Sequence, residues 1–158
     1  MTADEARTHI RYSGWASRRL LGAAMNLDPE QFHRDLTVPN KSVHGTLQHI
    51  CWADGIWLER VGGPPLQKGA IEMEWPQTHQ YWQKFADGLT DADLTRVVHY
   101  KDTKGNPYET PLSQIVLHVV NHATLHRGQV MAMFRQLGVA PPPTDLIFYY
   151  REQQSARA

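Results

Sequence analysis

The stretch LHVVNHATLHRGQ, residues 117–129, decides which fold this sequence indicates. It holds three of the chain's nine histidines, His118, His122 and His126, each four residues after the one before. Wound at about 100° per residue, the segment around it carries one apolar stripe. The stripe consists of Leu112, Ile115, Val116, Val119, Ala123, Val130, Phe134 and Leu137. His126 falls inside this stripe, His122 on its flank and His118 beyond its edge.

An ionisable side chain on an apolar face costs free energy unless something pairs with it. A metal ion held between helices would do so, and the His-x-x-x-His spacing can direct two imidazoles at one ion. The pattern is short, however. Taken alone, it more often belongs to ordinary histidines that are satisfied by hydrogen bonds or solvent.

Length and charge narrow the classes of protein to consider. The 158 residues are expected to form a single domain, 1–158, with a full core. Lysine plus arginine equals aspartate plus glutamate, 16 each, which disfavours binding to nucleic acid. We expect no signal peptide and no membrane span, because no apolar run is long enough. The single Cys51 rules out an internal disulfide and favours a cytoplasmic location.

Apolar spacing and capping signals predict four long helices, at about residues 3–27, 43–61, 74–89 and 111–137. Ser42 is the expected N-cap of the second helix, and Thr110 is the expected N-cap of the fourth. Pro76 is expected in the first turn of the third helix, and Gly138 is expected to end the fourth.

The connections between these helices carry signals of their own. Asp28 and Gln31 predict a capped helical turn within the connector that leads to residue 39. Residues 96–110 predict a hairpin or extended excursion before the last helix. The apolar patch at 147–150 is expected to pack back on the helices or on a partner subunit. We therefore predict an all-α fold, a four-helix bundle with a small extended excursion.

The sequence resembles the DinB family, within the wider DinB/YfiT-like superfamily, over nearly its whole length and in order. The matching segments are YSGWA at 12–16, SVHGTLQHI at 42–50, IWLER at 56–60, HVVNH at 118–122 and HRGQ at 126–129. Two positions depart from the family pattern. Ser17 stands where the family usually has asparagine, and Leu125 stands where it often has a further histidine.

The resemblance implies a four-helix bundle that holds a divalent metal ion through three histidines, one from the second long helix and two from the last. Carried over to this chain, these ligands are His49, His122 and His126. Zinc and nickel suit imidazole ligands best, and manganese or iron stay open as alternatives. The resemblance also implies a homodimer.

Several other residues invite a role, each with a plainer alternative. Asp54 falls in the apolar stripe of the second helix, where it would either orient a ligand histidine or form a buried ion pair, for example with Arg18 or Arg19. Arg127 would either bind a substrate carboxylate or form a salt bridge between helices or across a dimer. His118 is a neighbour of the metal site or a boundary histidine.

For other side chains the plain structural alternative is preferred. Cys51 is expected to be a small buried residue, because it lies about 200° around the helix from His49. The five tryptophans are expected in the core and in pocket walls. His79 is expected on an exposed segment and is given no role.

The site limits the chemistry without naming a reaction. Residues 122–126 lack the glutamate that zincin peptidases place beside their first histidine, so that activity is disfavoured. By analogy with thiol-cofactor-dependent transferases and isomerases of the superfamily, thiol transfer on a small molecule ranks first and metal-assisted hydrolysis second. The alternative from another class is a non-enzymatic, stress-associated metal-binding dimer.

Overall fold

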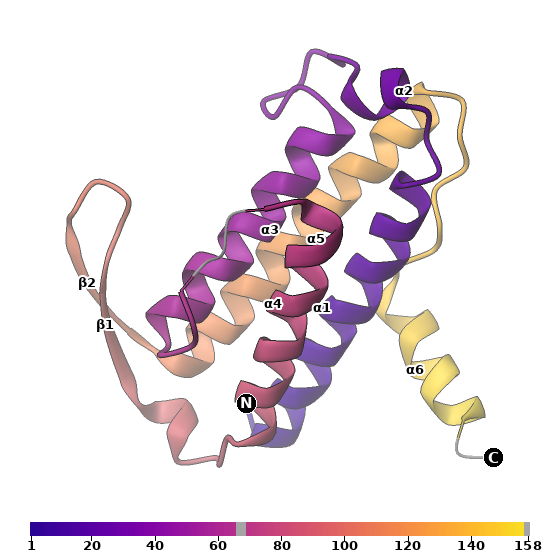
Figure 1. Ribbon diagram of the computed structural model, residues 1–158. Helices are drawn as coiled ribbons and strands as arrows, with labels where there is room; N and C mark the ends of the chain where they lie inside the picture. Colours follow the sequence, from indigo (N-terminus) through magenta and orange to yellow (C-terminus); the bar gives the residue numbers. More distant parts are fainter. Residues whose placement is uncertain (66–68, 157–158) are drawn as a thin grey trace.

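The chain is mostly helical in the computed structural model, which describes residues 1–65 and 69–156 (Figure 1). Four long helices are α1 (Ala3–Ala24), α3 (Val43–Arg60), α4 (Ile71–Asp87) and α5 (Leu112–Gln136). Shorter elements are α2 (Pro29–His33), a 3-10 turn η1 (Asp93–Thr95), the strands β1 (Val97–Lys101) and β2 (Pro107–Pro111), and α6 (Leu146–Ser155). The predicted loop after α3 lies partly outside the described residues.

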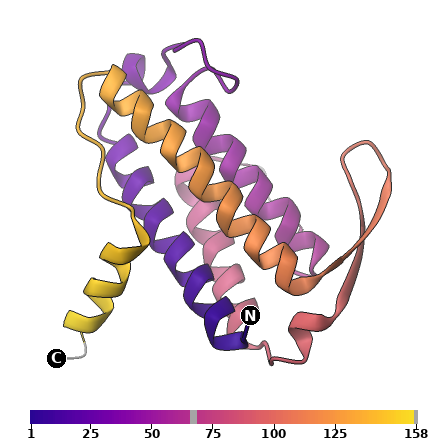
Figure 2. The same cartoon turned by 180° about the vertical axis from the view of Figure 1, so that it is seen from behind.

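The four long helices lie side by side, with the hairpin of β1 and β2 projecting at one end and α6 flanking α1 (Figures 1 and 2). Their apolar faces form two clusters, one around Trp82 and Ile115 and the other around Trp75 and Phe134. Burial of these faces supplies most of the free energy that holds the helices together. No helix in the described part of the chain is long and apolar enough to cross a membrane.

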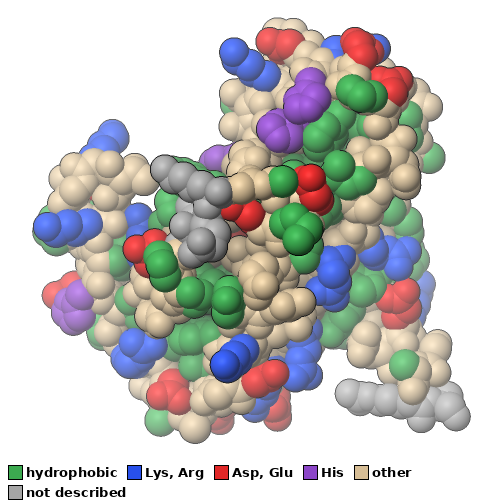
Figure 3. All heavy atoms as spheres, viewed as in Figure 1, with side chains coloured by type: hydrophobic (Ala, Val, Ile, Leu, Met, Phe, Trp, Pro, Cys, Tyr) green, Lys and Arg blue, Asp and Glu red, His purple; other side chains and the backbone are tan. Residues whose placement is uncertain are grey.

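Charged side chains of both signs are interspersed over the face shown in Figure 3, rather than gathered in one patch. This distribution agrees with the equal numbers of acidic and basic residues in the sequence.

The helix starts follow their capping chemistry. The Asp28 side chain accepts a hydrogen bond from the Gln31 backbone N–H, and Gln31 closes the predicted capping box. Ser42 accepts from the Gly45 N–H at 3.0 Å, as predicted for the start of α3. Each bond satisfies a backbone donor that the first turn of a helix leaves unpaired. α5 ends at Gln136, with Leu137 as its C-cap. Gly138 follows in a left-handed conformation with φ of +75°.

Two predicted helix starts are wrong. α4 begins at Ile71, so Pro76 lies in its second turn rather than its first. Thr110 does not cap α5. It belongs to β2, where it pairs with Val98, and its hydroxyl lies 3.2 Å from the Tyr100 hydroxyl. The hairpin ladder therefore continues to the residue before the helix and takes the place of a side-chain cap.

The predicted extended excursion is a two-stranded antiparallel hairpin in which Tyr100 pairs with Tyr108 and His99 with Glu109. Side chains alternate between the two faces of such a ribbon. Val98 is buried, and the Tyr100 ring packs on Trp57, so this face contacts the helices. His99 and Glu109 lie on the opposite face.

The tail forms helix α6, although its sequence predicts only an apolar patch at 147–150. Tyr149 is buried against Tyr12 and Trp15 of α1, with ring centroids 5.9 and 5.6 Å apart. The patch thus packs back on the helices through this residue, whereas Ile147, Phe148 and Tyr150 stay exposed.

Candidate metal centre

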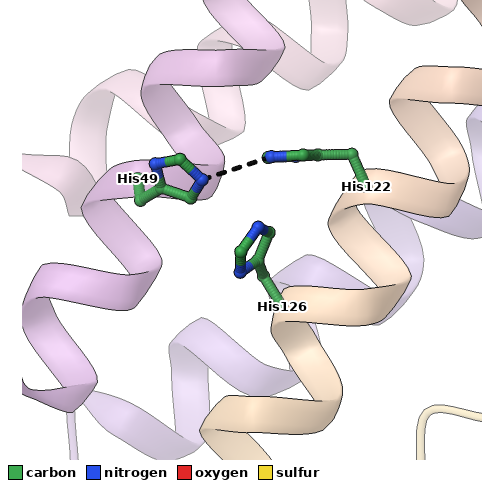
Figure 4. Close-up of side chains that lie close together, drawn as sticks. All are labelled: His49, His122 and His126. Atoms are coloured by element: carbon green, nitrogen blue, oxygen red, sulfur yellow. Dashed lines mark hydrogen bonds between the residues drawn. The ribbon is translucent and has the colours of Figure 1, made fainter. Parts of the chain in front are cut away.

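The three histidines carried over from the resemblance lie together between α3 and α5 (Figure 4). His49 comes from α3, and His122 and His126 come from successive turns of α5. One ring nitrogen from each lies within 4.8 Å of the other two, and the Nε2 atoms of His49 and His122 are 3.2 Å apart. Among the described residues, this is the one group of three or more such side chains that can hold a metal ion.

The spacing of these nitrogens fits a transition metal. Ligand nitrogens about 2.0–2.1 Å from a tetrahedral zinc ion lie about 3.3 Å from one another. The 3.2 Å separation of the His49 and His122 nitrogens is close to that edge. The three histidines can therefore hold a divalent metal ion.

The protonation of the site also suits a metal. Burial, followed by the charge of His126, lowers the pKa of His49. Burial, followed by His126 and then His49, lowers the pKa of His122 to about 4. Both imidazoles are therefore unprotonated at neutral pH and keep a free lone pair.

The third histidine is oriented by its own helix. His126 Nδ1 lies 2.8 Å from Gln129 Oε1, so Nδ1 carries the proton and donates to that oxygen. Nε2 is then the nitrogen with the lone pair. Gln129 thereby fixes the tautomer that a metal requires.

The site lies at the surface of the helical body rather than inside it, because all three rings are half-buried. His126 was predicted inside the apolar stripe of α5, and it lies instead at the edge of that stripe. The buried position is taken by the next residue, Arg127, which is 1% exposed. The helix is turned so that imidazoles line the rim of the core.

His118 lies one turn before His122, with its ring 5.8 Å from that of His122. It also contacts Trp57 of α3 at 5.0 Å. Of its two predicted positions, His118 takes the one beside the candidate metal centre.

Asp54 is buried, but both predicted partners are wrong. One of its carboxylate oxygens accepts a hydrogen bond from Trp75 Nε1 at 2.8 Å and lies 3.4 Å from His79 Nε2. It contacts α4 rather than a ligand histidine, Arg18 or Arg19. His79, predicted to be exposed, is 4% exposed. The signal that could have placed it is its position one turn after Trp75 and one turn before Trp82.

Arg127 is also different from its prediction. Its guanidinium is enclosed between α1 and α5, where it donates to the hydroxyls of Ser13, Ser17 and Thr124 at 2.9–3.1 Å. In the described part of the chain no carboxylate lies within 4.0 Å of it, so the predicted salt bridge to another helix of the same chain is not formed. Ser17, one of the two departures from the family pattern, supplies one of these hydroxyls.

Cys51 is buried as expected, and burial raises the pKa of its thiol to about 12. A protonated thiol in such a position does not bind metal. The tryptophans divide into three groups. Trp75 and Trp82 are in the core and Trp15 and Trp57 are half-buried, whereas Trp52 is exposed, against the prediction.

The family model of the DinB family matches residues 1–157. The chain belongs to the DinB family. Protein DinB of Bacillus subtilis (strain 168) is 28% identical over 93% of this chain and 94% of its own length.

A solved structure shares the fold of this DinB-family chain. It is the crystal structure of a DinB-like protein from Bacillus cereus ATCC 10987, with a TM-score of 0.60 and 21% identity. The match covers 84% of this chain and 91% of the other.

Proposed function

We propose that this DinB-family protein binds one divalent metal ion through His49, His122 and His126 and uses it as a metal-dependent enzyme of the thiol-transferase type. The observation that carries the proposal is the convergence of three half-buried imidazole nitrogens within 4.8 Å, two of them on rings whose pKa is lowered. Three neutral ligands leave the ion its full charge, with which it would favour the thiolate form of a bound thiol.

Half-burial of the ligands favours an enzyme over a structural site. A structural zinc site is closed by four protein ligands, whereas a catalytic site keeps three and an open position. Only three such side chains converge in the part of the chain that the structure describes, and all three rings remain in contact with solvent. A small molecule can therefore reach the ligand atoms.

Metal-assisted hydrolysis is the second candidate, and His118 is the observation that favours it. Its ring is 5.8 Å from that of His122 and is partly exposed, and its partial burial, followed by the charge of Arg60, lowers its pKa. An unprotonated imidazole beside the site has the chemistry of a general base.

The remaining expectations belong to the same proposal. The four long helices are proposed to form the family's bundle, and zinc or nickel is the proposed metal, with manganese or iron as alternatives. We also propose that the protein is a cytoplasmic homodimer that binds neither nucleic acid nor a membrane. A non-enzymatic metal-binding dimer is the alternative if no small molecule reaches the ion.

The test is metal content by mass spectrometry on untagged protein, for the wild type and the variants His49→Ala and His126→Ala. We expect about one divalent ion per chain in the wild type and a loss in both variants. His99→Ala is the matched control, because His99 is exposed and paired with Glu109 on the outer face of the hairpin. Retention of metal by the folded variants, or its absence from the wild type, would refute the site.

A further inference from the structure

A strip of side chains leads from the three ligands toward the hairpin. Arg60 follows His49 by eleven residues, which is three turns and about 16 Å of helix, and returns to within about 20° of the same line. Ile56 lies on the same line between them. α3 thus carries one half-buried strip that starts at the candidate metal centre at His49 and ends at Arg60.

Arg60 is held in place at the end of this strip. Its guanidinium lies over the rings of Trp57 and Tyr100, 4.5 and 4.9 Å from their centroids. One of its nitrogens donates to the backbone oxygen of Lys101 at 2.8 Å. Two aromatic faces and a carbonyl fix the direction of the group without neutralising its charge.

No acid neutralises this cation from the part of the chain that the structure describes, since no carboxylate there lies within 4.0 Å of it. Glu109 is near in sequence to Tyr108, but it lies on the other face of the hairpin, where it pairs with His99 at 3.1 Å. Arg60 is therefore an oriented and unpaired positive charge.

The path back to the candidate metal centre is continuous. The Trp57 ring that supports Arg60 is 5.0 Å from the ring of His118, and His118 is 5.8 Å from His122. The charge of Arg60 also contributes to the lowered pKa of His118. One elongated molecule bound at the ligands can therefore extend along Trp57 and His118 and reach Arg60.

We infer that Arg60 is a specificity-determining residue that binds a carboxylate of the thiol whose sulfur reaches the metal site. The inference rests on the proposed function, and it adds the chemical class of the ligand, an elongated thiol with an anionic end. An arginine whose orientation is already fixed loses little entropy when it binds a carboxylate, which makes the pairing favourable.

The test uses the protein loaded with cobalt(II), whose absorption changes when a thiolate binds. The probes are two forms of the N-acetylated peptide Cys-Gly-Gly-Gly-Gly, one with a free C-terminal carboxylate and one with a C-terminal amide. Both carry the same thiol at one end of five residues, which extend to about 17 Å, and only the acid form has a carboxylate. The dissociation constants are measured for the wild type, Arg60→Gln, Arg60→Lys and the control Arg135→Gln. Arg135 is an exposed arginine at the far end of α5, and its replacement makes the same change in net charge.

We expect the wild type and Arg135→Gln to bind the acid form of the peptide about tenfold more tightly than the amide form. Arg60→Gln binds the two equally, with the affinity for the amide form unchanged, and Arg60→Lys keeps part of the preference. The unchanged affinity for the amide form separates carboxylate binding from a disturbed hairpin, which would weaken both ligands.

Each remaining outcome overturns a distinct statement. Equal affinity of the wild type for both thiols, or the same loss in Arg60→Gln and Arg135→Gln, overturns the role of Arg60 and leaves thiol binding intact. Cobalt-loaded protein that binds neither thiol overturns the thiol chemistry of the proposed function, and the inference with it. Failure to bind cobalt refutes the three ligands themselves.

Discussion

At the scale of single residues, the buried polar side chains of Arg127 and Asp54 determine how α5 and α3 pack against the neighbouring helices. Arg127 joins α5 to α1 through two serine hydroxyls, and Asp54 joins α3 to α4 through Trp75 and His79. Because Arg127 directly follows His126, the position of the guanidinium also fixes the rotation of α5 about its axis. His126 therefore lies at the rim of the core because Arg127 occupies the buried position next to it.

Replacement of Arg127 by alanine is expected to lower the free energy of unfolding by about 3 kcal/mol. The change leaves a cavity and removes the donors on which the hydroxyls of Ser13 and Ser17 depend. Urea denaturation checks the value. Arg135→Ala, on the exposed face of the same helix, is the control and should change stability by less than about 0.5 kcal/mol. Equal effects of the two changes would contradict the structural role given to Arg127.

The stability of the metal-free protein is expected to fall as the pH drops from about 6.5 toward 4. The pKa of His122 is lowered to about 4 in the folded state, so the unfolded chain binds protons more readily over this range. The stabilisation is present above pH 6.5 and is lost on acidification. His122 contributes on the order of 2 kcal/mol, less than the full shift because its ring is partly solvated.

The measurement for this prediction is urea denaturation at several pH values, with chelator present, for the wild type and His122→Gln. The variant lacks the titrating group and should show a flatter decline than the wild type. A wild-type profile parallel to that of the variant would count against the lowered pKa.

At the scale of elements, a glycine of α1 and a glycine of α3 differ in the space around them, so replacing each is expected to change stability in opposite directions. A Cβ on Gly22 would meet nothing within 4 Å, whereas a Cβ on Gly45 would lie far inside contact distance of the Asn40 carbonyl oxygen. The turn before α3, in which Lys41 has a φ of +65°, folds back over the first turn of the helix. Glycine at position 45 makes that close approach possible.

Gly22→Ala is therefore expected to stabilise the protein by about 0.5–1 kcal/mol, because alanine loses less backbone entropy in a helix. Gly45→Ala is expected to destabilise it by about 2 kcal/mol, since the backbone near Asn40 must shift. Thermal unfolding of the two single variants checks both signs. Stabilisation by Gly45→Ala would show that the close approach is absent.

At the scale of the whole molecule, the candidate metal centre ties α3 to α5 across the edge of the helical body. A ligand that binds only the folded state stabilises it, by about 2.7 kcal/mol at a concentration one hundred times its dissociation constant. Added zinc is thus expected to raise Tm in a concentration-dependent way. The gain should vanish in His49→Ala and remain in His99→Ala. An equal rise in both variants would indicate binding elsewhere.

Much of the architecture was predictable because its signals are local. The apolar periodicity of α1, α3 and α5, the cap at Ser42 and the break at Gly138 depend on residues within one or two turns of each other. The hairpin at 96–110 was also predicted from a β-prone run and a turn. Errors arose where a distant partner overrode the local preference. Thr110, a good helix cap by type, pairs with Val98 in the ladder instead.

The candidate metal centre was likewise predictable from local sequence signals only in part. The spacing of His122 and His126 and the resemblance to the DinB family marked the three histidines in the sequence, since one-turn spacing places two imidazoles on one helix face. Only the tertiary structure decided that His49 meets them, that Arg127 rather than His126 faces the core, and that His79 is buried against Asp54. Such contacts depend on how helices far apart in sequence rotate and pack against each other, and no local pattern encodes that rotation.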